Sequence, residues 1–167
     1  MKISSLPLLT LSFFLLFQTT AEAKNKGISN AQLKRAKLHW SHFQDAGKRY
    51  RLDPKLLLAI SLHESSCRVT AINKKNRNKS IDVGLMQVNS WWFPQVKKYT
   101  PNLNNLYDPR FNIHVGAWIF KQCTNRFSNT AQAIDCYNKG APRAKKTSTY
   151  ARGVLNKYNK VKKINIH

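Results

Sequence analysis

The chain has 167 residues and a formal net charge of +22, from 29 basic and 7 acidic side chains. Its hydrophobic and aromatic fractions, 42% and 11%, are enough for a core and exclude a disordered tail, and its length fits one domain. Three cysteines are too few for a disulfide-rich miniprotein. The basic excess predicts either a solvated surface or an anionic partner such as nucleic acid, anionic lipid or cell-wall polymer.

Residues 1–23 have the pattern of a secretory signal peptide. Lys2 precedes an apolar run over 6–17, and Ala21-Glu22-Ala23 has the small-x-small form of a cleavage site. The run is shorter than the roughly 20 apolar residues of a spanning helix, so we expect cleavage after Ala23 and no integral membrane anchor afterwards. The domain would then occupy residues 24–167. Export of a basic chain favours an envelope polymer over nucleic acid, for which no specific motif is present.

Residues 24–30 are polar, and beyond them the chain reads as mainly α-helical. Asp-Pro pairs at 53–54 and 108–109 are typical of helix starts, with Asp as N-cap and Pro in the first turn. We expect short helical turns within 84–99, an irregular stretch at 100–107 and no period-2 strand. Apolar spacing and these start signals predict helices at 30–50, 54–66, 113–127, 130–140 and, very basic, about 147–164. The helix at 54–66 is apolar on nearly all sides and should be central and buried.

The three cysteines fall within the expected exported domain. An oxidising compartment permits a disulfide, and Cys123 and Cys136 lie on two successive predicted helices joined by a short turn. Their bridge would close a loop of roughly 15 residues, which stabilises by about 3 kcal/mol. Cys67 would then remain free, although the sequence does not exclude pairing through it.

Glu64 is the single glutamate of residues 24–167. It lies two turns after Leu57, on the same face of the most apolar helix, where an ionised carboxylate is costly unless it is paired or functional. Apolar surroundings and the negative end of the helix dipole both favour its protonated form and raise its pKa. A glutamic acid with a raised pKa suits general acid catalysis near neutral pH. A basic neighbour that satisfies the carboxylate is an equally good interpretation of this pattern.

Two further segments carry weaker signals. In 81–89, Gly84 permits a close approach, and the amides of Gln87 and Asn89 suit neutral polar ligands such as sugar hydroxyls and N-acetyl groups. Near 136–140, Tyr137 offers a ring and a hydroxyl for a sugar. Each segment alone is also explained by helix capping and core packing.

In their order and spacing, three segments resemble the lytic transglycosylase family with the goose-type lysozyme-like fold. Glu64-Ser65-Ser66 resembles the family's catalytic segment, residues 84–87 resemble its G-L-M-Q segment, and residues 137–140 resemble its Y-N-x-G segment. The resemblance spans about 50–140 and is closest to the small transglycosylases of secretion, conjugation and pilus systems. Lys139 stands where the family often has a small residue, and Arg110 where this subgroup often has a cysteine.

The resemblance implies a single helical domain with a substrate cleft, peptidoglycan as substrate, no cofactor and a periplasmic location. Glu64 would protonate the bond between N-acetylmuramic acid and N-acetylglucosamine, and the muramoyl C6 hydroxyl would close a 1,6-anhydro ring. That intramolecular attack lessens the need for the second carboxylate that most glycosidases use. The substrate-binding residues implied are Ser65, Met86, Gln87, Asn89, Tyr137 and Asn138.

Two alternatives remain open at this point. A hydrolytic muramidase of the same fold would use Asp82 as a secondary carboxylate to hold a water. A non-catalytic cationic wall-binding protein would not need Glu64, and salt would abolish its binding. His39 and His42 lie close together without a clear third ligand, so no metal site is expected.

Overall fold

The computed structural model describes residues 27–140 and 147–166, so the predicted signal peptide and its cleavage site lie outside the described residues. Seven α-helices and one small sheet make up this part of the chain. The helices are α1 (Asn30–Leu38), α2 (Trp40–Tyr50), α3 (Pro54–Glu64), α4 (Phe93–Val96), α5 (Pro109–Arg126), α6 (Thr130–Lys139) and α7 (Thr149–Lys162). The prediction of a mainly α-helical domain is confirmed, and no helix of these residues has both the length and the apolar character needed to cross a membrane.

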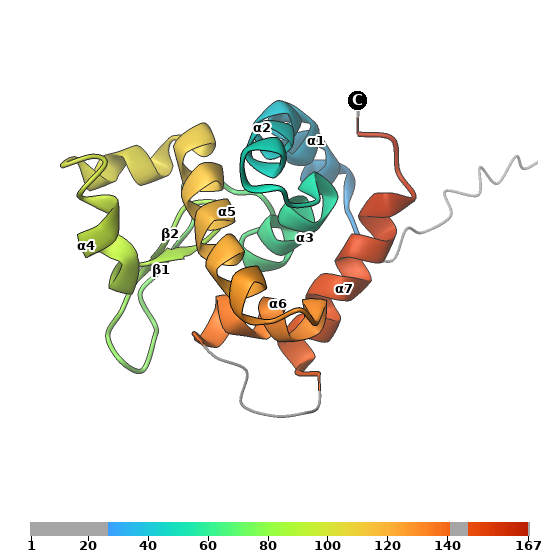
Figure 1. Cartoon of the computed structure of the whole chain (residues 1–167). Helices are drawn as coiled ribbons and strands as arrows, with labels where there is room; N and C mark the ends of the chain where they lie inside the picture. Colours follow the sequence, from blue (N-terminus) through green and yellow to red (C-terminus); the bar gives the residue numbers. More distant parts are fainter. Residues whose placement is uncertain (1–26, 141–146, 167) are drawn as a thin grey trace, which may run out of the picture.

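Helix α3 lies at the centre of the molecule, with α2 and α7 packed against it (Figure 1). Asp53 caps it by accepting a 2.7 Å hydrogen bond from the amide of Lys55, and Pro54 occupies its first position. Leu57 and Ile60 are fully buried. Burial of each such side chain contributes about 1.5–3 kcal/mol, which fixes the helix that ends at Glu64.

The predicted helix over 30–50 is in fact two helices. His39 lies between α1 and α2 with φ −111° and ψ 7°, and its backbone N–H still donates to the carbonyl oxygens of Ala36 and Lys37. Its side chain is buried beside Trp40 at the start of α2. Apolar spacing continues across the break, which is why the sequence pattern does not reveal it.

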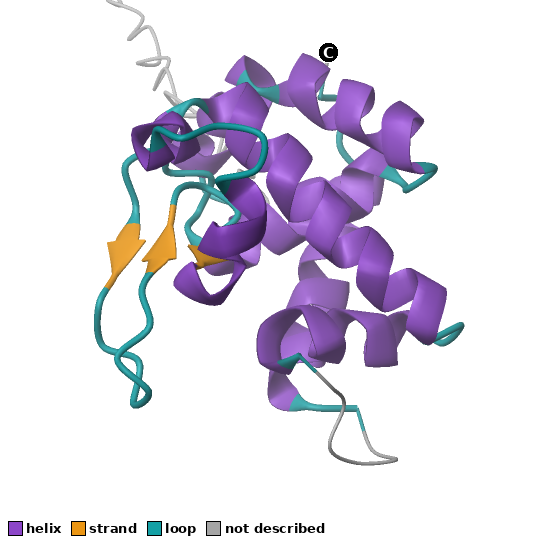
Figure 2. Ribbon diagram, turned by 60° about the vertical axis from the view of Figure 1, so that its left-hand side comes forward, coloured by secondary structure: helices purple, strands orange, loops and turns teal. Residues whose placement is uncertain are grey.

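The prediction that 84–89 is helical is wrong, because part of this segment belongs to a three-stranded antiparallel sheet. Strands β1 (Ile72–Asn73), β2 (Asp82–Val83) and β3 (Val88–Asn89) lie side by side in chain order (Figure 2). Asp82 pairs with Asn73 on one side and Asn89 on the other. Strands of two residues are too short to show an alternating pattern.

Two apolar clusters divide the fold, and α5 contributes to both. The larger cluster surrounds α3, and the smaller one lies beneath the sheet and includes Val83 and Leu106. Phe120 of α5 belongs to the first and its neighbour Ile119 to the second. Short 3-10 helices flank α4 and cover the smaller cluster, at Ser90–Trp92 and Leu103–Tyr107.

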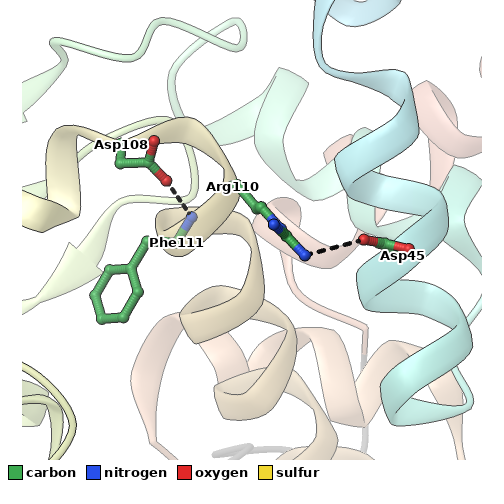
Figure 3. Close-up of polar contacts among 4 residues, drawn as sticks. All are labelled: Asp45, Asp108, Arg110 and Phe111. Atoms are coloured by element: carbon green, nitrogen blue, oxygen red, sulfur yellow. Dashed lines mark hydrogen bonds and ion pairs between the residues drawn. The ribbon is translucent and has the colours of Figure 1, made fainter.

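Figure 3 shows that the acidic residues near the start of α5 have structural partners. Asp108 accepts a 2.7 Å hydrogen bond from the amide of Phe111, as expected of an N-cap. Arg110 of α5 forms an ion pair with Asp45 of α2 at 3.6 Å. Both side chains of this pair are well exposed, so it contributes little to stability.

Candidate active site

Glu64 is the last residue of α3 and lines a polar cavity of about 600 Å³. Burial raises the pKa of Glu64 from its ordinary 4.5 to about 7, a hydrogen bond from Tyr150 opposes this rise, and the charge of Asp82 adds to it. A carboxyl group with this pKa both gives and takes a proton near neutral pH. The cavity residues come from α3, the turn after it, the sheet and the end of α6: Glu64, Arg68, Thr70, Ala71, Ile72, Asn73, Asn76, Asp82, Gln87 and Asn138.

Tyr150 in the first turn of α7 is the direct partner of Glu64. Its hydroxyl donates a 2.5 Å hydrogen bond to Oε1, and its ring packs edge-on against His63. Burial and the neighbouring Glu64 charge hold the pKa of Tyr150 well above 10, so it remains a donor. Sequence reasoning missed this residue, because 86 positions separate it from Glu64 and nothing local marks it.

Asp135 ties the start of α7 to α6 and so places Tyr150. It is buried in α6, and its carboxylate accepts hydrogen bonds from the hydroxyl and the amide of Ser148. Ser148 is also the N-cap of α7, where its hydroxyl accepts from the amide of Ala151. A buried carboxylate needs such partners, and this one fixes the helix that presents Tyr150 to Glu64.

The turn over residues 84–87 is built around a buried asparagine. Asn112 of α5 accepts from the amide of Met86 at 2.8 Å and donates to the carbonyl oxygens of Val83 and Leu106. Gly84 has φ +79°, and a Cβ there would collide with the Asn112 side chain. The turn is therefore locked against α5, and sequence reasoning did not single out Asn112.

Three residues expected to contact substrate have their side chains turned into the protein. Met86 is fully buried against Gly116, and its carbonyl oxygen accepts a 2.7 Å hydrogen bond from the Tyr137 hydroxyl. Ser65 is buried and donates to the carbonyl oxygen of Leu85 at 2.8 Å. Ser65, Met86 and Tyr137 do not line the cavity, so the structure gives these three residues supporting positions instead.

Gln87 and Asn138 do line the cavity with Glu64. The amide nitrogen of Gln87 donates to the carbonyl oxygens of Gly84 and Ala71 at 2.8 and 3.3 Å, which uses both of its N–H groups inside the protein. Asn138 is exposed at the end of α6, opposite the sheet. These two amides are the predicted binding residues that the structure brings to the site.

Asp82 also lines the cavity and is held by three asparagine amides. Asn73 and Asn76 each donate to its Oδ2 at 2.9 Å, and Asn89 donates to its Oδ1 at 2.6 Å. Asn89, predicted to bind substrate, instead orients Asp82 and caps the following turn through Trp91. The carboxylate of Asp82 therefore has a fixed orientation in the site.

Cys123 of α5 and Cys136 of α6 form a disulfide, with their Cα atoms 5.7 Å apart. It fixes the helix that carries Asn138. Cys67 is free and buried, and burial raises the pKa of its thiol to about 11, which makes it unreactive. Within 27–140 and 147–166 no three His, Cys, Asp or Glu side chains come together as a metal site would require.

A helical domain with a small sheet, and with one glutamic acid of raised pKa in a polar cavity between them, defines a lysozyme-like protein. Comparison with known proteins gives the family: residues 41–160 match the Transglycosylase SLT domain, and the chain belongs to this family of lytic transglycosylases, whose substrate is peptidoglycan. It is 32% identical over 120 residues to "Invasion protein IagB" of Salmonella typhimurium (strain SL1344), covering 70% of this chain and 74% of that protein. It is 33% identical over 131 residues to a "Peptidoglycan-binding-like protein" of Escherichia coli O157:H7, covering 73% and 78%.

Proposed function

We propose that this protein cleaves the β-1,4 bond between N-acetylmuramic acid and N-acetylglucosamine and leaves a 1,6-anhydromuramic acid end. The observation that carries the proposal is Glu64, a buried carboxyl group with its pKa at about 7 in the wall of a polar cavity. An ordinary glutamate with a pKa of 4.5 would be about one part in 300 protonated at pH 7, whereas Glu64 would be about half protonated.

In the proposed reaction Glu64 donates its proton to the bridging oxygen as the bond from that oxygen to the muramoyl anomeric carbon breaks. The C6 hydroxyl oxygen of the same sugar bonds to the anomeric carbon, and its proton passes to the now ionised Glu64. No water is consumed, and Glu64 ends protonated for the next cycle. Because the nucleophile is tethered to the sugar, its effective concentration supplies much of the acceleration.

Asp82 is the group that would decide between this reaction and hydrolysis. Three amide hydrogen bonds occupy three of roughly four lone-pair sites of its carboxylate. A carboxylate bound in this way has little room left to hold a water, but its fixed charge suits the positive charge that develops on the anomeric carbon. Asp82 therefore stabilises the transition state, while Gln87 and Asn138 position the sugars.

The protein would act in the periplasm after removal of residues 1–23, where peptidoglycan is accessible. We further propose that it opens the wall locally for a secretion, conjugation or pilus apparatus. The similarity to a protein named for invasion supports this role.

Mass spectrometry of purified peptidoglycan digested with residues 24–167 tests the proposal, with Glu64→Gln as the control. We expect fragments that end in 1,6-anhydromuramic acid and are lighter by one water than hydrolytic fragments, and none with Glu64→Gln. Reducing ends would instead assign a hydrolytic muramidase that uses Asp82. Binding without cleavage by both proteins would favour the non-catalytic wall-binding protein.

A further inference from the structure

The cavity that contains Glu64 also contains a cation with no partner among the residues that the structure describes. Arg68 lines the cavity, its side chain is exposed, and its guanidinium makes no hydrogen bond or ion pair with any described residue. Glu64 and Asp82, the acidic residues of the cavity wall, are not paired with it. An unpartnered arginine in a substrate site is suited to a ligand carboxylate, which its planar fork binds through two hydrogen bonds.

The backbone that carries Arg68 is rigid. Ser66 and Cys67 both have positive φ angles, 59° and 57°, and form a tight turn after α3. Arg35 donates to the carbonyl oxygen of Ser66 at 2.7 Å, and the amide of Arg68 donates to the buried Ser65 hydroxyl at 3.0 Å. The guanidinium therefore extends from a fixed point four residues beyond Glu64.

A second group of cations lies on the connection between β1 and β2, which Figure 1 shows extending from the sheet. We call this group the basic hairpin; its members are all exposed and are Lys74, Lys75, Arg77 and Lys79. Asparagine side chains order the connection: Asn73 accepts from the amide of Lys75, and Asn76 donates to the carbonyl oxygen of Ser80. Asn73 and Asn76 also line the cavity, so the basic hairpin belongs to a connection that borders the site.

We propose that Arg68 and the basic hairpin recognise the carboxylates of peptidoglycan stem peptides, so that the protein prefers glycan that carries charged peptides. This inference rests on the proposed function. A stem peptide branches from the muramoyl sugar next to the bond to be cleaved, and it carries free carboxylates. Those carboxylates would be repelled by Glu64 and Asp82, and Arg68 supplies the opposite charge at the same cavity. The exposed hairpin acts at longer range and raises the association rate at low salt.

The test compares two forms of the same peptidoglycan: native, and with its carboxylates converted to neutral amides by carbodiimide and ethanolamine. We expect kcat/KM to favour the native form by about tenfold, equivalent to about 1.4 kcal/mol. In Arg68→Gln this ratio should fall toward one, while Arg68→Lys, which keeps the charge but not the fork, should retain part of it. Arg51→Gln removes the same charge from an exposed position outside the cavity and should keep the ratio.

The hairpin is tested by a triple variant, Lys74→Gln, Lys75→Gln and Arg77→Gln, against a control triple of equal charge, Lys34→Gln, Lys48→Gln and Arg51→Gln. We expect the hairpin triple to reduce the preference at low salt but not at high salt, and the control triple to retain it. A wild-type protein without preference, an Arg68→Gln variant that keeps it, or equal losses in both triples would overturn the inference.

Binding separates this inference from the proposed function. With Glu64→Gln as the background, pelleting of the protein with insoluble native and amidated peptidoglycan should show the same preference and the same dependence on Arg68. If the wild-type protein produced anhydro ends equally from native and amidated peptidoglycan, anion recognition would be refuted and the proposed reaction would stand. Preferential binding without anhydro ends from any substrate would refute the proposed reaction and leave anion recognition supported.

Discussion

The hydrogen bond from Tyr150 to Glu64 predicts a measurable shift in the pKa of Glu64. This bond favours the ionised carboxylate, so it lowers the pKa, while burial raises it to a net value of about 7. Tyr150→Phe should therefore raise the pKa of Glu64 further. A hydrogen bond to a charged group contributes about 1.5–3 kcal/mol, and one pKa unit corresponds to about 1.4 kcal/mol, so we expect a rise of about one to two units.

The sequence offers a direct assay for this shift. Because Glu64 is the single glutamate of residues 24–167, isotope labelling of glutamate gives one side-chain carboxyl resonance to titrate by NMR. We expect a midpoint of about 7 in the wild-type protein, a higher one in Tyr150→Phe and a lower one in Asp82→Asn, since the Asp82 charge raises the pKa.

Tyr158→Phe is the matched control for this titration. Tyr158 lies on the same helix, but its hydroxyl donates to Asp53 rather than to Glu64. Its removal should leave the Glu64 midpoint in place. A midpoint in Tyr150→Phe that stays at the wild-type value or moves down would refute the reasoning. The alkaline limb of the kcat/KM profile should move in the same direction as the NMR midpoint, since the protonated form donates the proton.

Three further predictions concern stability. The folded-state pKa of Glu64 lies above the unfolded value of 4.5, so the wild-type protein loses stability as pH rises from about 4.5 through 7. In urea unfolding, the free energy of unfolding of Glu64→Gln should therefore rise relative to that of the wild type by up to about 3 kcal/mol across this pH range. A difference between the two proteins that does not change with pH would contradict the raised pKa. Asp135→Ala should lower the free energy of unfolding by about 1–3 kcal/mol in the same assay, because Ser148 loses its buried partner. It should also raise the NMR midpoint of Glu64, as Tyr150→Phe does, because the start of α7 no longer holds Tyr150 in place. An unchanged midpoint would show that Asp135 does not position Tyr150. Cys136→Ser, which removes the disulfide with Cys123, should lower the free energy of unfolding by about 3 kcal/mol. Reduction of the wild-type protein should lower it by the same amount if the loss comes from the disulfide itself.

Local signals in the sequence predicted the framework of the fold. Asp-Pro pairs start α3 and α5 as expected, because an N-cap and a proline act on the adjacent residues alone. The helix predicted at 130–140 is α6, which begins after the N-cap Asn129 and ends before Gly140. The apolar character of α3 predicted its burial.

The sequence predicted the site in part, and what it missed depends on long-range contacts. Glu64, Gln87, Asn138 and Asp82 lie together at the cavity. Tyr150 and Asn112 carry no local pattern, since each acts through contacts with segments that are distant in the sequence. Short polar motifs also do not show which way a side chain faces, and for this reason Ser65, Met86 and Asn89 were expected at the substrate but support the site from within.

The most direct test of the central claim, that the nucleophile is the substrate's own C6 hydroxyl, is digestion of peptidoglycan in water enriched in heavy oxygen, followed by mass spectrometry of the new muramic acid ends. The proposed reaction consumes no water, so the ends should be 1,6-anhydro and carry no heavy oxygen. Ends that contain heavy oxygen at the anomeric position in the wild-type digest, and that disappear with Asp82→Asn, would contradict the claim and assign the chemistry to a water held by Asp82.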